Sequence, residues 1–207
     1  MKWYPLEDTF TVGCFCCQEI RLRRFNFRQV YVTVTRCNFN LSPFIASLSD
    51  VETIRFHGHI LECVEREFLI PKQPKLFNRL TEISLEINLG DLKEANFALC
   101  LFQHAPNLRF FKLKLIRNSM VPRVHFWESI DRDVCLFQNV EVVGLVDFTG
   151  SFAELGFLKF LLEGAPMLRK LGIIDKGLDR NVLKSLLKLR RASKDAEILI
   201  LEACFPH

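Results

Sequence analysis

A short hydrophobic motif, apolar-x-x-apolar-x-apolar, recurs along the chain at intervals of about 28 to 32 residues. Alternate side chains of a strand face opposite ways, so the last two apolar positions of each copy point into one core. The first apolar position turns inward from the preceding loop. The motif therefore predicts parallel strands that stack to share one hydrophobic core. Its copies are Val51, Ile54, Phe56; Leu80, Ile83, Leu85; Leu108, Phe111, Leu113; Val140, Val143, Leu145; Leu168, Leu171, Ile173; and Ala196, Leu199, Leu201, and Leu22, Phe25, Phe27 fit as an earlier copy.

A longer repeat contains two copies of this motif. The segment 76–115 overlays the segment 136–175 without gaps when the chain is shifted by about sixty residues. Self-similarity at a fixed spacing is typical of repeat architectures, in which each unit packs on the next. The matched positions include Leu76-Phe77 with Leu136-Phe137, Gly90 with Gly150, Phe97 with Phe157, Ala105-Pro106 with Ala165-Pro166, and Leu108-Arg109 with Leu168-Arg169.

Helices are predicted between the strands, over residues 91–104, 152–163 and 180–189. The first two have apolar residues at helical spacing, including Leu92 and Phe152. Each of these two starts at a polar residue, Asp91 or Ser151, which suits an N-cap. Each ends near an Ala-Pro pair, because proline cannot continue a helix.

This alternation predicts an α/β fold, namely a leucine-rich-repeat solenoid with parallel strands on its concave side and helices on its convex side. The repeats would occupy residues 1–126 and continue without a break into residues 127–207. The alternative is a doubly wound α/β sheet, which uses the same elements. A doubly wound sheet gives no reason for the sequence to repeat, so we favour the solenoid.

The C-terminal half resembles the plant F-box/FBD/LRR proteins. The resemblance lies in the run 136–143 (LFQNVEVV), the run 148–155 (FTGSFAEL), the run 157–168 (FLKFLLEGAPML) and the closing run 190–198 (RRASKDAEI). It covers roughly residues 127–202, and the segment 48–54 with the strands after it resembles the repeat region of the family. The resemblance implies FBD-like repeats at residues 127–207 and a role in recognising the substrate of a ubiquitin ligase.

The chain departs from this family in residues 1–50. Members of the family have an F-box there, which docks on a Skp-type adaptor of a cullin ubiquitin ligase. No Leu-Pro-led helical run is present, and Val30, Val32 and Val34 alternate with polar residues as in a strand. We therefore expect no direct docking on the cullin adaptor.

Composition narrows the remaining classes. With 207 residues, 49% hydrophobic and 25% charged, the chain is expected to be globular. A net charge of +4 gives no case for nucleic-acid binding. No apolar run is long enough for a membrane span, and the N-terminus does not read as a signal peptide. We expect a cytoplasmic or nuclear protein whose eight cysteines are free thiols.

Catalytic, cofactor and metal sites are not predicted. Cys14, Cys16 and Cys17 form a metal half-site, but buried or edge cysteines explain them better than zinc does. The remaining ligands of a zinc site would have to come from Cys37, His57, His59 and Cys63. No histidine motif fixes a base beside a cysteine nucleophile, and no glycine-rich phosphate loop exists. Asp131 and Asp133 lie in a predicted loop and read as solvated carboxylates.

A protein partner is predicted on the concave face, where the strands would show their variable side chains. The residues expected to contact it are Arg55, Glu86, Phe110, Lys112 and Lys114. Here the aromatic side chain would anchor the partner and the charges would orient it. The alternative is that Glu86 and Lys112 pair with each other across neighbouring strands.

The sequence thus predicts a protein–protein interaction module that resembles the substrate-recognition part of an F-box receptor without the F-box. One alternative is an interaction scaffold unconnected with degradation. Another, from a different class, is a metal- or thiol-dependent enzyme.

Overall fold

The computed structural model describes residues 8–12, 18–26, 29–36, 50–58, 77–116, 126–131, 136–175 and 178–202. The described part holds one sheet whose strands lie in the order in which they occur along the chain. The strands are β1 (Asp8–Val12), β2 (Gln18–Asn26), β3 (Gln29–Arg36), β4 (Thr53–Gly58), β5 (Glu82–Ile87), β6 (Phe110–Leu115), β7 (Val142–Phe148), β8 (Lys170–Asp175) and β9 (Glu197–Glu202).

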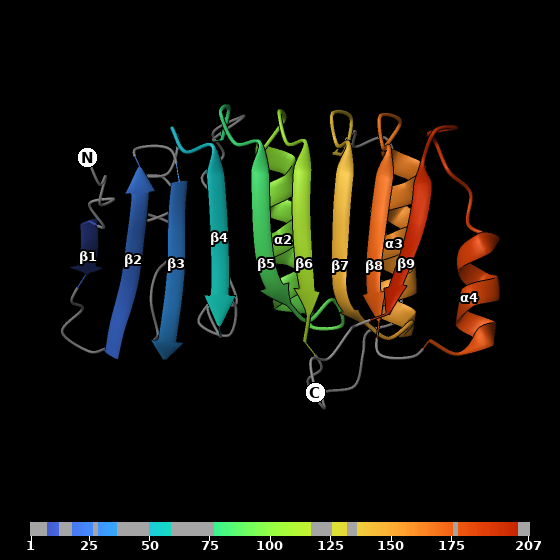
Figure 1. Cartoon of the computed structure of the whole chain (residues 1–207), viewed down its shortest axis with the longest axis horizontal. Coiled ribbons are helices and arrows are strands. Elements are labelled where there is room, and N and C mark those ends of the chain that lie inside the picture. The colour runs from blue at the N-terminus through green and yellow to red at the C-terminus, as the bar shows by residue number, and fades with distance from the viewer. Residues whose placement is uncertain are drawn as a thin grey trace, which may run out of the picture.

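From β3 to β9 every neighbouring pair of strands is parallel (Figure 1). The strands that follow Val51, Leu80, Leu108, Val140 and Leu168 therefore occupy neighbouring positions in chain order, as the motif predicted. The fold class α/β is confirmed, since helices separate several of these parallel strands.

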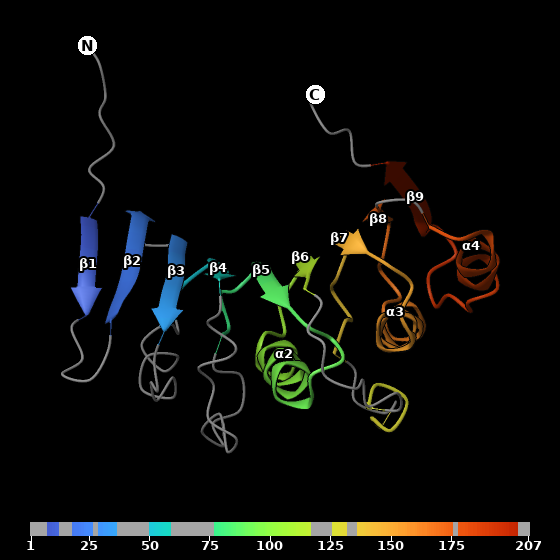
Figure 2. The ribbon, with the colours of Figure 1, turned by 90° about the horizontal axis from the view of Figure 1, so that it is seen from below.

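Among the described residues, helices α2 (Leu92–His104), α3 (Phe152–Gly164) and α4 (Arg180–Leu187) connect consecutive strands. Figure 2 shows these helices on one side of the sheet, while the other side carries none of them. The row of strands bends so that this helix-free face, which we call the open face, lies on the inner side of the bend.

The predicted helix starts are confirmed. Asp91 caps α2, because its carboxylate accepts hydrogen bonds from the backbone of Lys93 and Glu94. Ser151 caps α3 in a capping box with Glu154. The third helix ends at Leu187, two residues before the predicted end.

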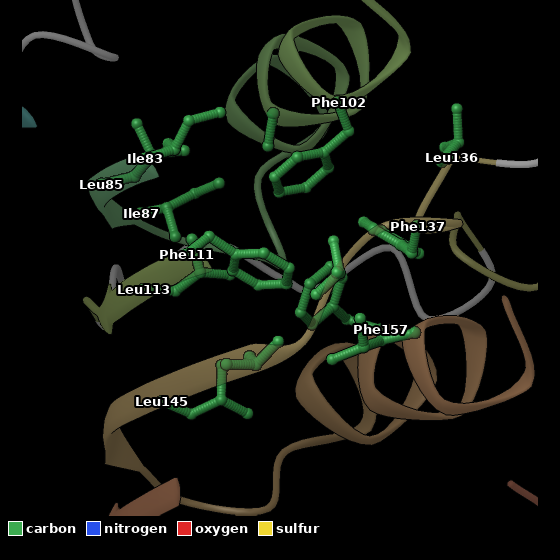
Figure 3. Packing of buried hydrophobic residues seen from close by; sticks show 14 of the residues in the cluster. Ile83, Leu85, Ile87, Phe102, Phe111, Leu113, Leu136, Phe137, Leu145 and Phe157 are labelled. Atoms are coloured by element: carbon green, nitrogen blue, oxygen red, sulfur yellow. The ribbon is translucent and has the colours of Figure 1, made fainter. Parts of the chain in front are cut away.

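The core lies between the sheet and the helices. Strands β5 and β6 bury every second residue, as a strand with one covered face must. Aromatic rings from helix and strand meet at the centre, where the ring centroids of Phe102 and Phe111 lie 5.2 Å apart and those of Phe102 and Phe137 also lie 5.2 Å apart (Figure 3). Phe157 of α3 joins this cluster beside Phe111, at 6.4 Å. The cluster thereby connects successive strand–helix units.

Backbone hydrogen bonds repeat with the sequence motif. The carbonyl oxygens of Glu52, Thr81, Arg109 and Glu141 each accept two N–H groups from the segment where the next strand begins, at 2.8–3.1 Å. Four of the first motif positions end a turn, donating their N–H to the carbonyl three residues earlier: Leu80 to Phe77, Leu108 to Ala105, Val140 to Phe137 and Leu168 to Ala165. These turns bring the first apolar side chain of each motif into the core, where all four are buried.

Two expectations about the ends of the sheet were wrong. Strand β2, which holds Leu22 and Phe25, pairs antiparallel with both β1 and β3, so it belongs to a meander rather than to the parallel series. In β9 the register pairs Leu171 with Ile198. Leu199 therefore lies on the open face and not in the core, because a slip of one residue exchanges the two faces of a strand.

One expectation about the buried faces of the helices was also wrong. Leu92 and Phe152 were expected on the apolar faces of their helices, but they are the first residues of α2 and α3 and are exposed, Phe152 to 74%. Apolar spacing along a helix does not show at which residue the helix begins to pack on the sheet, so it assigned these two side chains wrongly. Residues further along each helix, including Phe97 and Phe157, are buried as expected.

Candidate functional site

The candidate site is the open face between β4 and β9. Side chains that point away from the helices align in rows across the strands, because parallel neighbours pair in register. Three rows cross β5 to β8: Glu82, Phe110, Val142, Lys170; Ser84, Lys112, Gly144, Gly172; and Glu86, Lys114, Val146, Ile174. The rows set charged side chains on β5 and β6 beside small and apolar ones on β7 and β8.

Two ion pairs join neighbouring strands of this face. The guanidinium of Arg55 on β4 lies 2.9 Å from the carboxylate of Glu82 on β5. The ammonium of Lys114 on β6 lies 3.0 Å from the carboxylate of Glu86 on β5. Both pairs are partly exposed, so each stabilises the fold by at most about 1 kcal/mol. Each pair neutralises the charges of its own two side chains.

The alternative in which Glu86 pairs with Lys112 was wrong, because Glu86 pairs with Lys114. Register places Glu86 opposite Lys114, whereas Lys112 lies between Ser84 and Gly144. Within the described part of the chain, no carboxylate lies within ion-pair distance of Lys112. Lys112 is thus a cation on the open face whose charge the neighbouring strands do not balance.

A depression of about 370 Å³ opens on this face over β5 to β9. Gly144 and Gly172 lie side by side in its floor. The depression forms there because neither residue has a side chain to fill the space. We call this depression the glycine groove. It is lined by Glu82, Ile83, Phe110, Phe111, Lys112, Val142, Val143, Gly144, Lys170, Gly172 and Leu199.

Exposed apolar side chains border the groove. Phe110 is partly exposed at its β6 side, with the guanidinium of Arg109 5.6 Å from the centre of its ring. On β9, Leu199 and Leu201 are 43% and 51% exposed. Exposed aromatic and aliphatic groups gathered on one face are typical of protein interfaces.

All five residues predicted to contact a partner lie on strands of the open face: Arg55 on β4, Glu86 on β5, and Phe110, Lys112 and Lys114 on β6. The structure brings Phe110 and Lys112 to the groove and holds Arg55, Glu86 and Lys114 in ion pairs beside it. Lys170 and Leu199 also line the groove and were not among the predicted contacts. The motif around Leu199 assigned that side chain to the core, and only the register of β9 corrects this.

A second cavity, of about 260 Å³, lies on the helical side and is lined by Phe137, by residues of α3 and by the segment after α4. The N–H of Ala192 donates to the carbonyl of Leu162 at 2.8 Å, and Nη1 of Arg191 donates to the carbonyl of Ala196 at 3.0 Å. Positive charge at the C-terminal end of a helix such as α3 is favourable. We therefore interpret this cavity as part of the junction that attaches the segment after α4 to α3.

Sites for other chemistry were sought among the described residues. That part of the chain has no group of three or more His, Cys, Asp or Glu side chains that could hold a metal ion. Cys14, Cys16, Cys17, Cys37, His59, Cys63 and Asp133 lie outside the described residues, as does the side chain of His57. Cys100 is a partly buried free thiol and Asp131 is exposed.

None of the helices described here combines the length and the apolar character that crossing a lipid bilayer would need. Comparison of the chain with protein-family models, with curated proteins and with solved structures gave no match.

Proposed function

We propose that the chain is a leucine-rich-repeat solenoid that binds a protein partner on its open face. The observation that carries the proposal is the composition of that face. Consecutive strands carry two ion pairs, the exposed side chain of Phe110 and the mainly apolar glycine groove. A rigid face with an aromatic anchor and orienting charges suits protein recognition.

The repeat assignment is supported by features that recur about every 28 to 32 residues in both sequence and backbone. The apolar motif, the turn before it and the doubly accepting carbonyl return in successive units. A unit of this kind cannot bury its own apolar side and is stable only when stacked on its neighbours. Stacked strands then present one continuous surface, which repeat proteins use for binding.

The resemblance to the plant F-box/FBD/LRR proteins narrows the role. We propose that the module recognises a substrate in the manner of such a receptor, in the cytoplasm or nucleus, and without direct docking on a cullin adaptor. Residues 127–207 would be the FBD-like part of the same solenoid, continuous with repeats over 1–126. We propose no catalytic, cofactor or metal-binding role for the chain.

The test is capture of partners from plant extract on the immobilised chain, with variants of two faces. Phe110→Asp changes the open face, and Phe152→Asp places the same charge on an exposed phenylalanine at the start of α3. A partner lost with Phe110→Asp and retained with Phe152→Asp supports the proposal. Loss of the partner only with Phe152→Asp would contradict it.

The same experiment separates recognition for degradation from a scaffold role. Recovery of cullin-ligase subunits together with the partner would favour a substrate receptor that is linked to the ligase indirectly, whereas partners alone would favour a scaffold. Once a partner is known, the double variant Lys112→Glu, Lys114→Glu should weaken its binding by more than about tenfold, because two orienting charges are reversed.

A further inference from the structure

The glycine groove has a defined shape across the strands. Lys112 on β6 and Leu199 on β9 stand in the same row as Gly144 and Gly172, so the two glycines form the low part between two walls. Neighbouring strands lie about 4.8 Å apart, so the groove spans about 14 Å from β6 to β9. That length matches about four or five residues of extended chain, at about 3.3 Å for each residue.

The floor of the groove has room for side chains of a ligand. A Cβ atom built on Gly144 would lie 3.6 Å from its nearest neighbour, the Cγ of Lys112, and one built on Gly172 would lie 3.9 Å from the carbonyl of Val143. Both are ordinary van der Waals distances. Apolar side chains can therefore rest on the glycines between Phe110 and Leu199.

The charged side chains that line the groove favour an acidic group on the ligand. Lys112 and Lys170 both line the groove, on strands about 10 Å apart, and neither forms an ion pair with a described residue. Glu82 also lines the groove, but its carboxylate is already paired with Arg55. Glu197 lies beside Lys170 in register, yet no ion pair joins them. One carboxylate placed between the two lysines would be within reach of both side chains.

The backbone of the floor is not available to a ligand. Strands β6, β7 and β8 are paired on both sides, so their N–H and C=O groups are already engaged. A bound segment must therefore be recognised by its side chains while it lies across the strands, and it cannot add to the sheet there.

We infer that the glycine groove binds a short extended segment of the partner protein, in which one acidic side chain contacts Lys112 and Lys170 and neighbouring apolar side chains rest on Gly144 and Gly172. This inference rests on the proposed protein-binding function and adds the chemistry of the bound segment. The apolar side chains that line the groove, among them Phe110, Val142 and Leu199, favour a peptide over a nucleic-acid backbone, whose phosphates repeat and whose sugars are polar.

The test is selection of peptides from a displayed library of random decapeptides on three forms of the full chain. The wild type should enrich peptides with Asp or Glu next to apolar residues. The variant Lys112→Glu, Lys170→Glu should enrich Lys or Arg instead. The control Lys184→Glu, Lys188→Glu makes the same charge change on exposed residues at α4 and should select the wild-type peptides.

Affinities of one selected peptide then measure the contribution of each feature. Fluorescence anisotropy should show at least a tenfold loss for Lys112→Glu, and less than a twofold change for Lys184→Glu. Gly172→Leu should also lose at least tenfold, because its side chain occupies the groove. Unchanged thermal unfolding of each variant confirms that the fold is intact.

Several outcomes would overturn the inference. These are a library that yields no binder, selected peptides with no preference for acidic residues, and equal loss of binding with the α4 control. Self-association of the chain that disappears in Lys112→Glu, Lys170→Glu would identify a second copy as the occupant instead. If partner capture still depends on Phe110 while the library shows no acidic preference, the proposed function stands and this inference alone fails.

Discussion

Glu94 and Glu154 lie about sixty residues apart and occupy equivalent positions in the first turns of α2 and α3. Both side chains are buried, and both carboxylates accept hydrogen bonds from the turn that precedes their helix. Oε2 of Glu94 accepts from the N–H of Asn88 at 2.7 Å. Oε2 of Glu154 accepts from the N–H groups of Thr149 and Gly150, each at 2.8 Å. A buried carboxylate therefore shapes the strand-to-helix turn in two successive units.

Removing this carboxylate should destabilise the protein. Glu154→Ala leaves the N–H groups of Thr149, Gly150 and Ser151 without their acceptor. Hydrogen bonds to a charged group contribute about 1.5–3 kcal/mol, and unsatisfied buried donors add a cost. We expect the free energy of unfolding in urea to fall by about 2–3 kcal/mol.

The control for this prediction is Asp179→Ala at the start of α4, where the acidic side chain makes no capping hydrogen bond to the backbone. It should change the stability by less than about 0.5 kcal/mol. Equal effects of the two variants would show that Glu154 contributes only as a charge near a helix N-terminus.

Much of the parallel sheet could be predicted from the sequence because the apolar positions of the motif are the positions that are buried at strands β4 to β8. In β5, Ile83, Leu85 and Ile87 alternate with polar residues, so only one face of that strand can be buried. The same pattern placed Phe110, Lys112 and Lys114 on the open face, where the structure has them.

The parts of the sheet that could not be predicted lack this alternation of apolar and polar residues. Residues Ile198, Leu199, Ile200 and Leu201 are all apolar, so the pattern is compatible with either register and only pairing with β8 decides it. The apolar spacing in β2 does not decide whether this strand pairs parallel or antiparallel with β3. The pairing of Glu86 with Lys112 was two residues out of register, because the offset of 28 residues between the motif copies places Lys114 opposite Glu86.

Gly150 should not tolerate a side chain. Its φ of 74° is in the left-handed region, and an added Cβ would lie 2.3 Å from Cγ1 of Val182 in α4. Strain and overpacking each cost about 1–3 kcal/mol, so Gly150→Ala should lower the free energy of unfolding by more than about 2 kcal/mol.

A double-mutant cycle separates the two causes. Val182→Ala removes the two methyl groups that an added Cβ at Gly150 would strike and leaves the Cβ of residue 182 at 3.1 Å. The double variant should therefore recover most of the loss due to the clash and keep the part due to φ. Purely additive effects would mean that α4 does not pack against this turn as described. Gly144→Ala is the control, because a Cβ added there would make only an ordinary van der Waals contact with Lys112, at 3.6 Å.

The ion pair between Arg109 and Glu141 should contribute little to stability despite its short nitrogen–oxygen distances. Nε and Nη2 of Arg109 both donate to Oε1 of Glu141, at 2.9 and 2.6 Å. The Arg109 side chain is half exposed, so water and salt screen the pair. A double-mutant cycle with Arg109→Ala and Glu141→Ala should give a coupling of about 0.5–1 kcal/mol that falls as salt is raised to 1 M. A coupling above about 2 kcal/mol, unaffected by salt, would contradict this assignment.

Phe152 and Phe157 test whether the core lies where the aromatic cluster places it. Both belong to α3, but Phe152 is exposed, whereas Phe157 is fully buried with its ring centroid 4.8 Å from that of Trp127. Phe157→Ala leaves a cavity between α3, the sheet and Trp127, and the loss of a buried phenylalanine costs about 3–5 kcal/mol. Phe152→Ala removes the same side chain from the surface of the same helix and should cost less than about 0.5 kcal/mol. Urea unfolding followed by circular dichroism measures both variants. Similar losses for the two would mean that the helix packs on the sheet through a different face, and the position of the open face would then be wrong as well.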